Sequence, residues 1–118
     1  MPTTPSRPAG PPPTFGEVDP RHIGEDLVLD VREDDEWAAG HAPDAMHVPL
    51  QTLPGRLADL PAGRPIAVIC RSGGRSGQAS AFLAQQGFAV RNVTGGMHAW
   101  EQSGLPMVAD GDAAPRVD

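Results

Sequence analysis

The sequence predicts an α/β domain in which helices cover both faces of a central, mostly parallel five-stranded sheet. Short apolar stretches rich in β-branched residues alternate with stretches of helical spacing. This alternation is typical of βα units, whose strands run parallel. Residues 66–69 form a continuous apolar run, and residues 27–31 do so apart from Asp30, as expected of strands buried on both faces. The chain of 118 residues has room for one such domain.

The strands and helices can be assigned in chain order. The expected strands cover residues 15–18, 27–31, 46–48, 66–69 and 88–93. The expected helices are a short one after Asp19-Pro20, one over 33–39 that ends at Gly40, one with the apolar stripe Leu53, Leu57 and Leu60, one that ends at Gly87, and one over 97–102. Strands and helices therefore alternate along nearly the whole length between the two ends of the chain.

Capping residues mark the ends of these helices. Asp19 followed by Pro20 is a favourable pair for an N-cap and a first helical position. Gly87 is a natural left-handed residue for a helix end, and Phe88 is then placed to contact Leu83 in a Schellman closure. Because the helix over 33–39 carries acidic residues in its first turn, its macrodipole is stabilised there.

The composition bounds the domain and its partners. Residues 1–14 contain six prolines and are predicted to be a disordered tail, residues 15–107 the domain, and residues 108–118 a flexible C-terminal tail. The net charge of −6 argues against binding to nucleic acid or to an anionic membrane surface. No apolar run approaches membrane-spanning length, and a lone cysteine survives best as a thiol in a reducing compartment. We therefore expect a cytoplasmic protein.

The segment Cys70-Arg71-Ser72-Gly73-Gly74-Arg75-Ser76 combines the only cysteine with the features of an anion-binding loop. It joins the carboxyl end of a strand to the amino end of a helix, where backbone N–H groups converge and glycines let the backbone approach an anion. The helix dipole, Arg71 and Arg75 add positive charge. A cysteine there should have a lowered pKa and be largely thiolate near neutral pH. The pattern favours a nucleophile over a buried structural cysteine.

Asp30 and Arg32 are expected at the same edge of the sheet as Cys70, because the carboxyl ends of parallel strands meet there. Asp30 could act as a general acid or a ligand, although an aspartate at a strand end more often binds loop amides. Arg32 could hold an anion, or pair with a nearby acid such as Asp30, Glu33 or Glu36. The sequence leaves this choice open.

The four histidines have no spacing typical of a metal site, and one cysteine cannot complete a zinc site, so no metal is expected. His41 and His98 lie in or after loops on plausible sides of the sheet. A cysteine–histidine pair with Cys70 therefore stays open.

Four blocks resemble, in order, those of single-domain rhodaneses, a sulfurtransferase family. The blocks are Asp30-Val31-Arg32-Glu33 with Glu36-Trp37 and Gly40-His41; Ala42-Pro43-Asp44-Ala45 with Val48-Pro49-Leu50; the segment from Cys70 to Ser76; and Thr94-Gly95-Gly96-Met97-His98-Ala99-Trp100 with Gly104-Leu105-Pro106. The second block departs from the family at Ala42 and Asp44, where Ile and Gly are more usual. The resemblance runs from about Phe15 to Met107.

This resemblance implies a three-layer α/β/α rhodanese-like fold and the transfer of a sulfane sulfur. Cys70 would carry the sulfur as a persulfide, from an anionic donor such as thiosulfate to cyanide, a thiol or a protein acceptor. Asp30 and Arg32 would support the site, and neither a metal nor an organic cofactor is implied. The residues expected to bind the donor are Arg71, Ser72, Gly73, Gly74, Arg75 and Ser76.

Two other functions are open. Related cell-cycle phosphatases share the fold and bind phosphate with a Cys-x5-Arg loop. Here Cys70 and Arg75 are spaced as Cys-x4-Arg, and Ser76 stands where a phosphatase would need the arginine. The smaller ring of amides suits one sulfur atom better than a tetrahedral phosphate. The other possibility is a non-catalytic rhodanese module that binds partners or relays sulfur; such modules often lack the cysteine.

Overall fold

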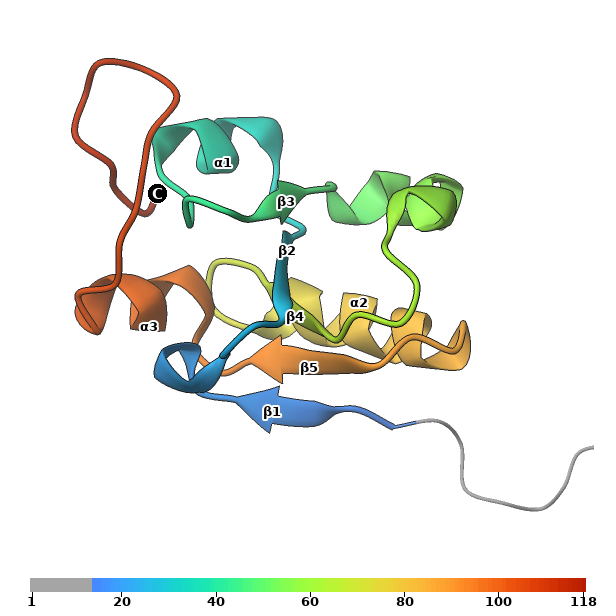
Figure 1. Ribbon diagram of the computed structural model, residues 1–118. Coiled ribbons are helices and arrows are strands. Elements are labelled where there is room, and N and C mark those ends of the chain that lie inside the picture. Colours follow the sequence, from blue (N-terminus) through green and yellow to red (C-terminus); the bar gives the residue numbers. More distant parts are fainter. Residues whose placement is uncertain (1–13) are drawn as a thin grey trace, which may run out of the picture.

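The computed structural model describes residues 14–118 and contains a single five-stranded sheet in this part of the chain (Figure 1). The strands are β1 (Gly16–Val18), β2 (Leu27–Asp30), β3 (Met46–His47), β4 (Ile66–Ile69) and β5 (Val90–Val93). They are ordered β1-β5-β4-β2-β3, and every neighbouring pair is parallel. The predicted α/β fold with a five-stranded sheet is confirmed. The tail predicted for residues 1–14 lies, apart from Thr14, outside the described residues.

Five helical segments connect the strands and follow the last one. They are η1 (Pro20–His22), α1 (Asp34–Ala39), η2 (Leu50–Asp59), α2 (Gly74–Gln85) and α3 (Gly96–Gln102). α2 packs on β4 and β5 and contacts η2, whereas α3 packs with η1. None of these helices is long and apolar enough to span a membrane.

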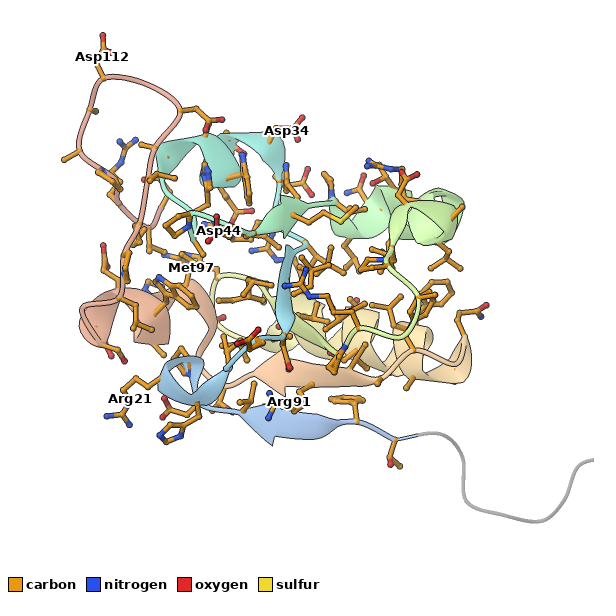
Figure 2. All side chains as sticks on the ribbon, in the orientation of Figure 1. Arg21, Asp34, Asp44, Arg91, Met97 and Asp112 are labelled. Carbon is orange, nitrogen blue, oxygen red and sulfur yellow. The ribbon has the colours of Figure 1, made fainter. Side chains whose placement is uncertain are left out.

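The core has two parts, one on each face of the sheet. Ile66 and Val68 of β4 pack in one cluster with Leu83 of α2, and the alternate residues Ala67 and Ile69 pack in the other. Because side chains alternate along a strand, a strand covered on both faces must be apolar at every position. All four residues of β4 are fully buried, and Figure 2 shows side chains filling the space on both sides of the sheet.

The helix ends follow the capping residues. The carboxylate of Asp19 accepts a hydrogen bond from the backbone N–H of Arg21 at 2.8 Å. At the end of α2, Gly87 has a φ of +92°, and the N–H of Phe88 donates to the carbonyl of Leu83 at 3.0 Å, which is the expected Schellman closure.

Leu53 and Leu57 of the leucine stripe lie on a 3₁₀ helix, η2, that contains Pro54, and Leu60 is the C-cap of this helix. Proline has no N–H to donate and disturbs the α-helical ladder around it. Leu53 and Leu60 are buried and Leu57 is partly buried, so the stripe still faces the core.

Residues 108–118 lie against α1. Val108 and His41 exchange two backbone hydrogen bonds of 2.9 Å, and the N–H of Arg116 donates to the carbonyl of Ala39 at 2.9 Å. A Cβ on Gly40 would lie 2.3 Å from the carbonyl oxygen of Arg116, so this approach requires glycine. These contacts place the segment, while its expected flexibility stays a prediction.

Candidate active site

Cys70 follows the last residue of β4 and is buried, with 1 % of its surface exposed. Asp30, at the end of β2, pairs in register with Ile69, and the N–H of Val31 donates to the carbonyl of Ile69 at 3.0 Å. The strand ends that carry Asp30 and Cys70 are therefore neighbours. This confirms the expectation that they share one edge of the sheet.

The sulfur of Cys70 faces polar groups of its own loop. The N–H of Gly73 donates to Sγ at 3.1 Å, and Oγ of Ser76 lies 3.3 Å from Sγ. The N–H groups of Ser72 and Ser76 also favour a negative charge on this sulfur. Gly73 has a φ of +121°, a conformation that glycine adopts without strain, and it is the N-cap of α2.

These contacts set the charge state of the cysteine. Burial disfavours the thiolate and by itself raises the pKa of Cys70. The Ser76 side chain and the N–H groups of Ser76, Gly73 and Ser72 stabilise the thiolate and outweigh the burial, so the pKa lies below its ordinary value. The pKa of Cys70 is thus shifted in the direction that the sequence predicted.

Arg75 is tied to α1. Its Nη1 and Nη2 donate to the two carboxylate oxygens of Glu36 at 2.7 and 2.9 Å. The hydrogen bonds from Arg75 outweigh the cost of burial and lower the pKa of Glu36 to about 2. The same pairing raises the pKa of Arg75. Arg75 therefore links the first turn of α2 to α1, and its geometry is that of a brace.

Arg71 lies at the exposed side of the loop. Its Nε donates to the main-chain oxygen of Asp118 at 2.7 Å. Residues 108–118 thus reach from α1 to the cysteine loop. Nothing in the sequence indicated this contact, because 47 positions separate the two residues.

Asp30 and Arg32 form a fully buried ion pair. Nε and Nη2 of Arg32 donate to the carboxylate of Asp30 at 3.0 and 2.8 Å. Nη2 also donates to the carbonyl of Gly40 at 2.8 Å. Of the alternatives that the sequence left open, the structure shows Arg32 paired with Asp30. The pair connects the end of β2 to the end of α1 and so supports the turn beside Cys70.

The amino end of α3 holds the cysteine loop from the other side. The N–H groups of Met97 and His98 donate to the carbonyls of Cys70 and Arg71 at 2.8 and 3.1 Å. Gly96 has a φ of +58°, and a Cβ there would lie 2.4 Å from the carbonyl oxygen of Cys70. Glycine at position 96 is thus required by a close backbone approach.

The histidine rings take no part in the contacts of the sulfur. Among residues 14–118, the hydrogen-bond partners of Cys70 Sγ include no histidine ring. The ring of His41 instead stacks on Trp37, with centroids 3.6 Å apart, and its Nδ1 bonds to the carbonyl of Trp37 at 2.8 Å. The structure gives the cysteine–histidine pair no support. In the described part of the chain, no three His, Cys, Asp or Glu residues are placed to hold a metal ion.

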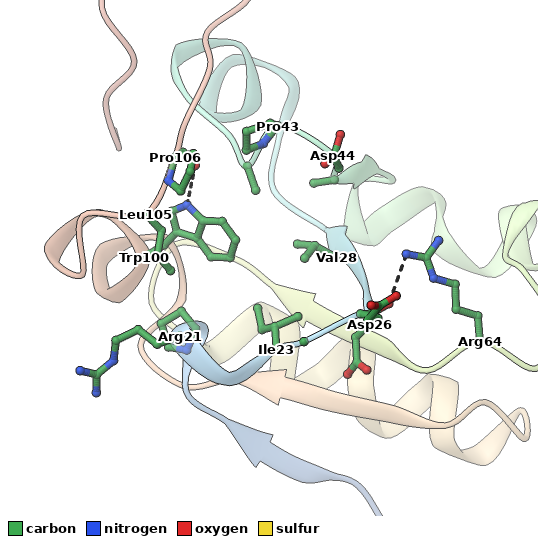
Figure 3. Close-up of a pocket in the computed structure, with 15 residues that line it drawn as sticks. Arg21, Ile23, Asp26, Val28, Pro43, Asp44, Arg64, Trp100, Leu105 and Pro106 are labelled. Atoms are coloured by element: carbon green, nitrogen blue, oxygen red, sulfur yellow. Dashed lines mark hydrogen bonds between the residues drawn. The ribbon is translucent and has the colours of Figure 1, made fainter.

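A groove of about 680 Å³ lies elsewhere on the domain, and none of residues 70–76 lines it. Figure 3 shows its lining. Val28 of β2, Trp100 of α3 and Pro43 contribute to its walls. The indole N–H of Trp100 donates to the carbonyl of Pro106 at 2.9 Å. Neither a cysteine nor a histidine lines this groove, so we assign it no part in the chemistry of Cys70.

Asn92 of β5 is a site residue that the sequence reasoning missed. Its Oδ1 accepts a hydrogen bond from Oγ of Ser76 at 2.5 Å. Asn92 is buried, with 6 % of its surface exposed, in a strand whose other members are mostly apolar. A buried polar residue inside a strand needs partners, so its position was the one signal that could have pointed to it.

Comparison with known proteins decides the family, because the rhodanese-like domain family matches residues 18–103. The chain belongs to the rhodanese-like domain family. A sulfurtransferase of Allochromatium vinosum is 45 % identical over 84 residues, which cover 70 % of this chain and 78 % of that protein. The thiosulfate sulfurtransferase GlpE of Actinobacillus pleuropneumoniae serotype 3 is 34 % identical over 101 residues, 80 % of this chain and 94 % of that protein.

The solved structures agree with this assignment. A rhodanese-related protein from Thermoplasma volcanium superposes with a TM-score of 0.76 at 32 % identity, over 80 % of this chain and 98 % of the other. The three-layer rhodanese fold is therefore confirmed, and this rhodanese-like domain belongs to a group whose relatives are named sulfurtransferases.

Proposed function

We propose that this rhodanese-like protein accepts a sulfane sulfur from an anionic donor such as thiosulfate onto Cys70 and passes it, as a persulfide, to cyanide, a thiol or a protein acceptor. One observation carries the proposal: the thiol faces the N–H of Gly73 and the hydroxyl of Ser76, and its pKa is lowered. The names of the relatives support sulfur transfer in general, and that of GlpE supports thiosulfate as donor.

The first step is an attack of the Cys70 thiolate on the outer sulfur of thiosulfate. The new bond joins Sγ to that sulfur, the sulfur–sulfur bond of thiosulfate breaks, and sulfite leaves with the bonding electron pair. The negative charge of the cysteine is then on the terminal sulfur of the persulfide. The backbone N–H groups of Ser72, Gly73 and Ser76 would stabilise this charge, as an oxyanion hole stabilises developing charge.

The second step returns the enzyme to its first state. A nucleophile such as cyanide attacks the terminal sulfur, the bond to Sγ breaks, and Cys70 leaves as a thiolate. Its lowered pKa makes it a good leaving group at neutral pH. Neither step needs a general base, because the cysteine enters and leaves as an anion.

The two arginines of the loop would have different roles. Arg71 is exposed and would attract the doubly charged donor to the mouth of the loop. Arg75 would add positive charge while Glu36 keeps its guanidinium in place. The buried pair of Asp30 and Arg32 would hold the neighbouring strand end without touching the substrate.

A reactive thiol is stable against oxidation in a reducing compartment, and we propose the cytoplasm as the location. Small sulfur donors and thiol, cyanide or protein acceptors are the proposed partners. The Cys-x4-Arg spacing between Cys70 and Arg75 does not favour phosphate chemistry.

The test is the intact mass of the protein after incubation with thiosulfate. Because Cys70 is the only cysteine, we expect a gain of one sulfur atom, which cyanide or dithiothreitol removes. The Cys70→Ser variant should fold and gain nothing. No gain in the native protein would refute the proposal. Release of phosphate from an aryl phosphate in a parallel reaction would then indicate a phosphatase, and inactivity in both assays a non-catalytic module.

A further inference from the structure

Asn92 contacts two residues of the cysteine loop, Ser76 and Gly73, that hydrogen-bond to the sulfur of Cys70. Its Oδ1 accepts the hydrogen bond from Ser76 Oγ, and its Nδ2 donates to the main-chain oxygen of Gly73 at 3.3 Å. Ser76 Oγ and the N–H of Gly73 are in turn 3.3 and 3.1 Å from Sγ. One side chain from β5 thus holds a side-chain group and a backbone group of the cysteine loop.

The orientation of the Asn92 amide follows from its neighbours. Nδ2 lies 3.3 and 3.2 Å from the carboxylate oxygens of Glu17, its partner in the register of β1 and β5. A carboxylate and a carbonyl are acceptors, so the NH₂ group must face Glu17 and Gly73. Oδ1 must therefore face Ser76, which can only be the donor of that hydrogen bond.

Glu17 is itself held in place. The hydroxyl of Thr94 donates to Oε1 of Glu17 at 3.0 Å. Asn92 is thus fixed from the edge of the sheet, through Glu17, and cannot turn to exchange its two polar ends without losing these contacts. These contacts keep Oδ1 of the amide directed at the hydroxyl of Ser76.

The hydroxyl of Ser76 has one proton and two neighbours that can accept it. It can donate either to Oδ1 of Asn92 or to Sγ of Cys70, but not to both. A thiolate is a charged acceptor and forms the stronger hydrogen bond. A neutral thiol, or a sulfur already bonded to a second sulfur, is a weak acceptor. The hydroxyl of Ser76 then donates to the amide oxygen of Asn92.

We propose that Asn92 is a positioning residue for Cys70. It keeps the N–H of Gly73 directed at Sγ. It also accepts a hydrogen bond from the hydroxyl of Ser76 while Sγ is uncharged, and this hydroxyl turns to the sulfur when the thiolate forms. The O–H bond rotates and no proton is transferred. A role of Asn92 in catalysis rests on the proposed sulfur transfer. The coupling between Asn92 and the ionisation of Cys70 does not depend on that function.

The native protein allows a direct test, because Asn92 is the only asparagine of the chain. Labelling with ¹⁵N-asparagine gives one side-chain NH₂ signal in an NMR spectrum. We expect this signal to shift with pH at the midpoint of the Cys70 titration, which the pH dependence of iodoacetamide alkylation measures independently. The shift at that midpoint should be absent in Cys70→Ser. A signal that does not follow the thiol, or follows the same curve in Cys70→Ser, would overturn the proposal.

A pair of variants tests the direction of the effect. The double variant Glu17→Gln/Asn92→Asp has the net charge of the native protein but carries the carboxylate at position 92. This carboxylate cannot donate to Gly73, holds the Ser76 hydroxyl more strongly and places a negative charge near the thiolate. All three effects raise the pKa of Cys70.

We expect the midpoint of alkylation in the double variant to lie about one pH unit above that of the matched control Glu17→Gln, which is about a tenfold slower reaction below the midpoint. Equal midpoints would contradict the proposal. Circular dichroism checks that both variants fold, and if the double variant does not, the NMR titration of the native protein decides.

The two proposals can fail separately. If thiosulfate adds no sulfur to the native protein, the proposed function is wrong, and both titrations still report on Asn92. If sulfur is added but the Asn92 signal does not shift at the midpoint of the Cys70 titration, the proposed sulfur transfer stands and the role of Asn92 is refuted.

Discussion

Replacing Glu36 with glutamine tests the brace between α1 and the cysteine loop. In the native protein, two hydrogen bonds of 2.7 and 2.9 Å join Glu36 to Arg75. Oε1 of Glu36 also accepts the backbone N–H of Glu33 at 2.9 Å, as part of the capping box of α1. Glutamine can still accept that N–H, so Glu36→Gln removes the charge of the brace and leaves the helix cap intact.

The size of the effect follows from the pKa of Glu36. Pairing with Arg75 lowers the pKa of Glu36 from 4.5 to about 2. Each unit by which folding lowers a pKa corresponds to about 1.4 kcal/mol of stability. The unscreened effect would be about 3 kcal/mol. Solvent reaches both side chains, which are 16 % and 33 % exposed, and screening reduces the effect. We expect Glu36→Gln to lower the free energy of unfolding by about 1–2 kcal/mol at pH 7.

The effect must also depend on pH in a defined direction. A carboxylate with a lowered pKa in the folded state stabilises the protein above its unfolded pKa, and this stability is lost as pH falls through the folded pKa. The native protein should therefore lose its advantage over Glu36→Gln between about pH 4.5 and about pH 2.

Urea unfolding at pH 7, 5, 4 and 3 measures both quantities. Glu101→Gln, on the exposed side of α3, is the matched control and should change the free energy of unfolding by less than about 0.5 kcal/mol. A difference between native protein and Glu36→Gln that stays constant from pH 7 to pH 3, or that matches the control, would refute the brace.

Three further predictions concern the cysteine loop. The alkylation rate of Cys70 should fall as pH drops through its lowered pKa, and Ser76→Ala should move that midpoint upward because the hydroxyl no longer stabilises the thiolate; an unchanged midpoint would exclude Ser76. Arg71→Ala should raise the KM for thiosulfate and reduce its dependence on salt, and a KM equal to the native value would remove Arg71 from the site. Deleting residues 116–118 removes the main-chain oxygen that Nε of Arg71 binds and should lower the KM for thiosulfate roughly threefold. Asp118→Ala keeps this oxygen and should leave the KM unchanged.

The sequence was sufficient for the features that depend on neighbouring residues. The continuous apolar run of 66–69 identifies a central strand, because a strand covered on both faces has no polar side. The step from this strand to the glycine-rich segment identifies the cysteine loop. The lowered pKa of Cys70 follows from the Ser76 hydroxyl and from the N–H groups that such a loop directs inward, which outweigh the burial of the thiol. Gly87 and Phe88 end α2 as their local pattern requires.

The pairing of side chains distant in the sequence was decided only by the tertiary structure. Arg75 could have met any of several acids, and the packing of α1 beside the loop selects Glu36. Asn92 faces Ser76 only because β5 lies next to β4 with its polar position on the side covered by α2. Local patterns set which element a residue belongs to, whereas register and packing set which side chains meet. The chemistry of the cysteine could thus be read from one short segment, and the residues that hold it in place could not.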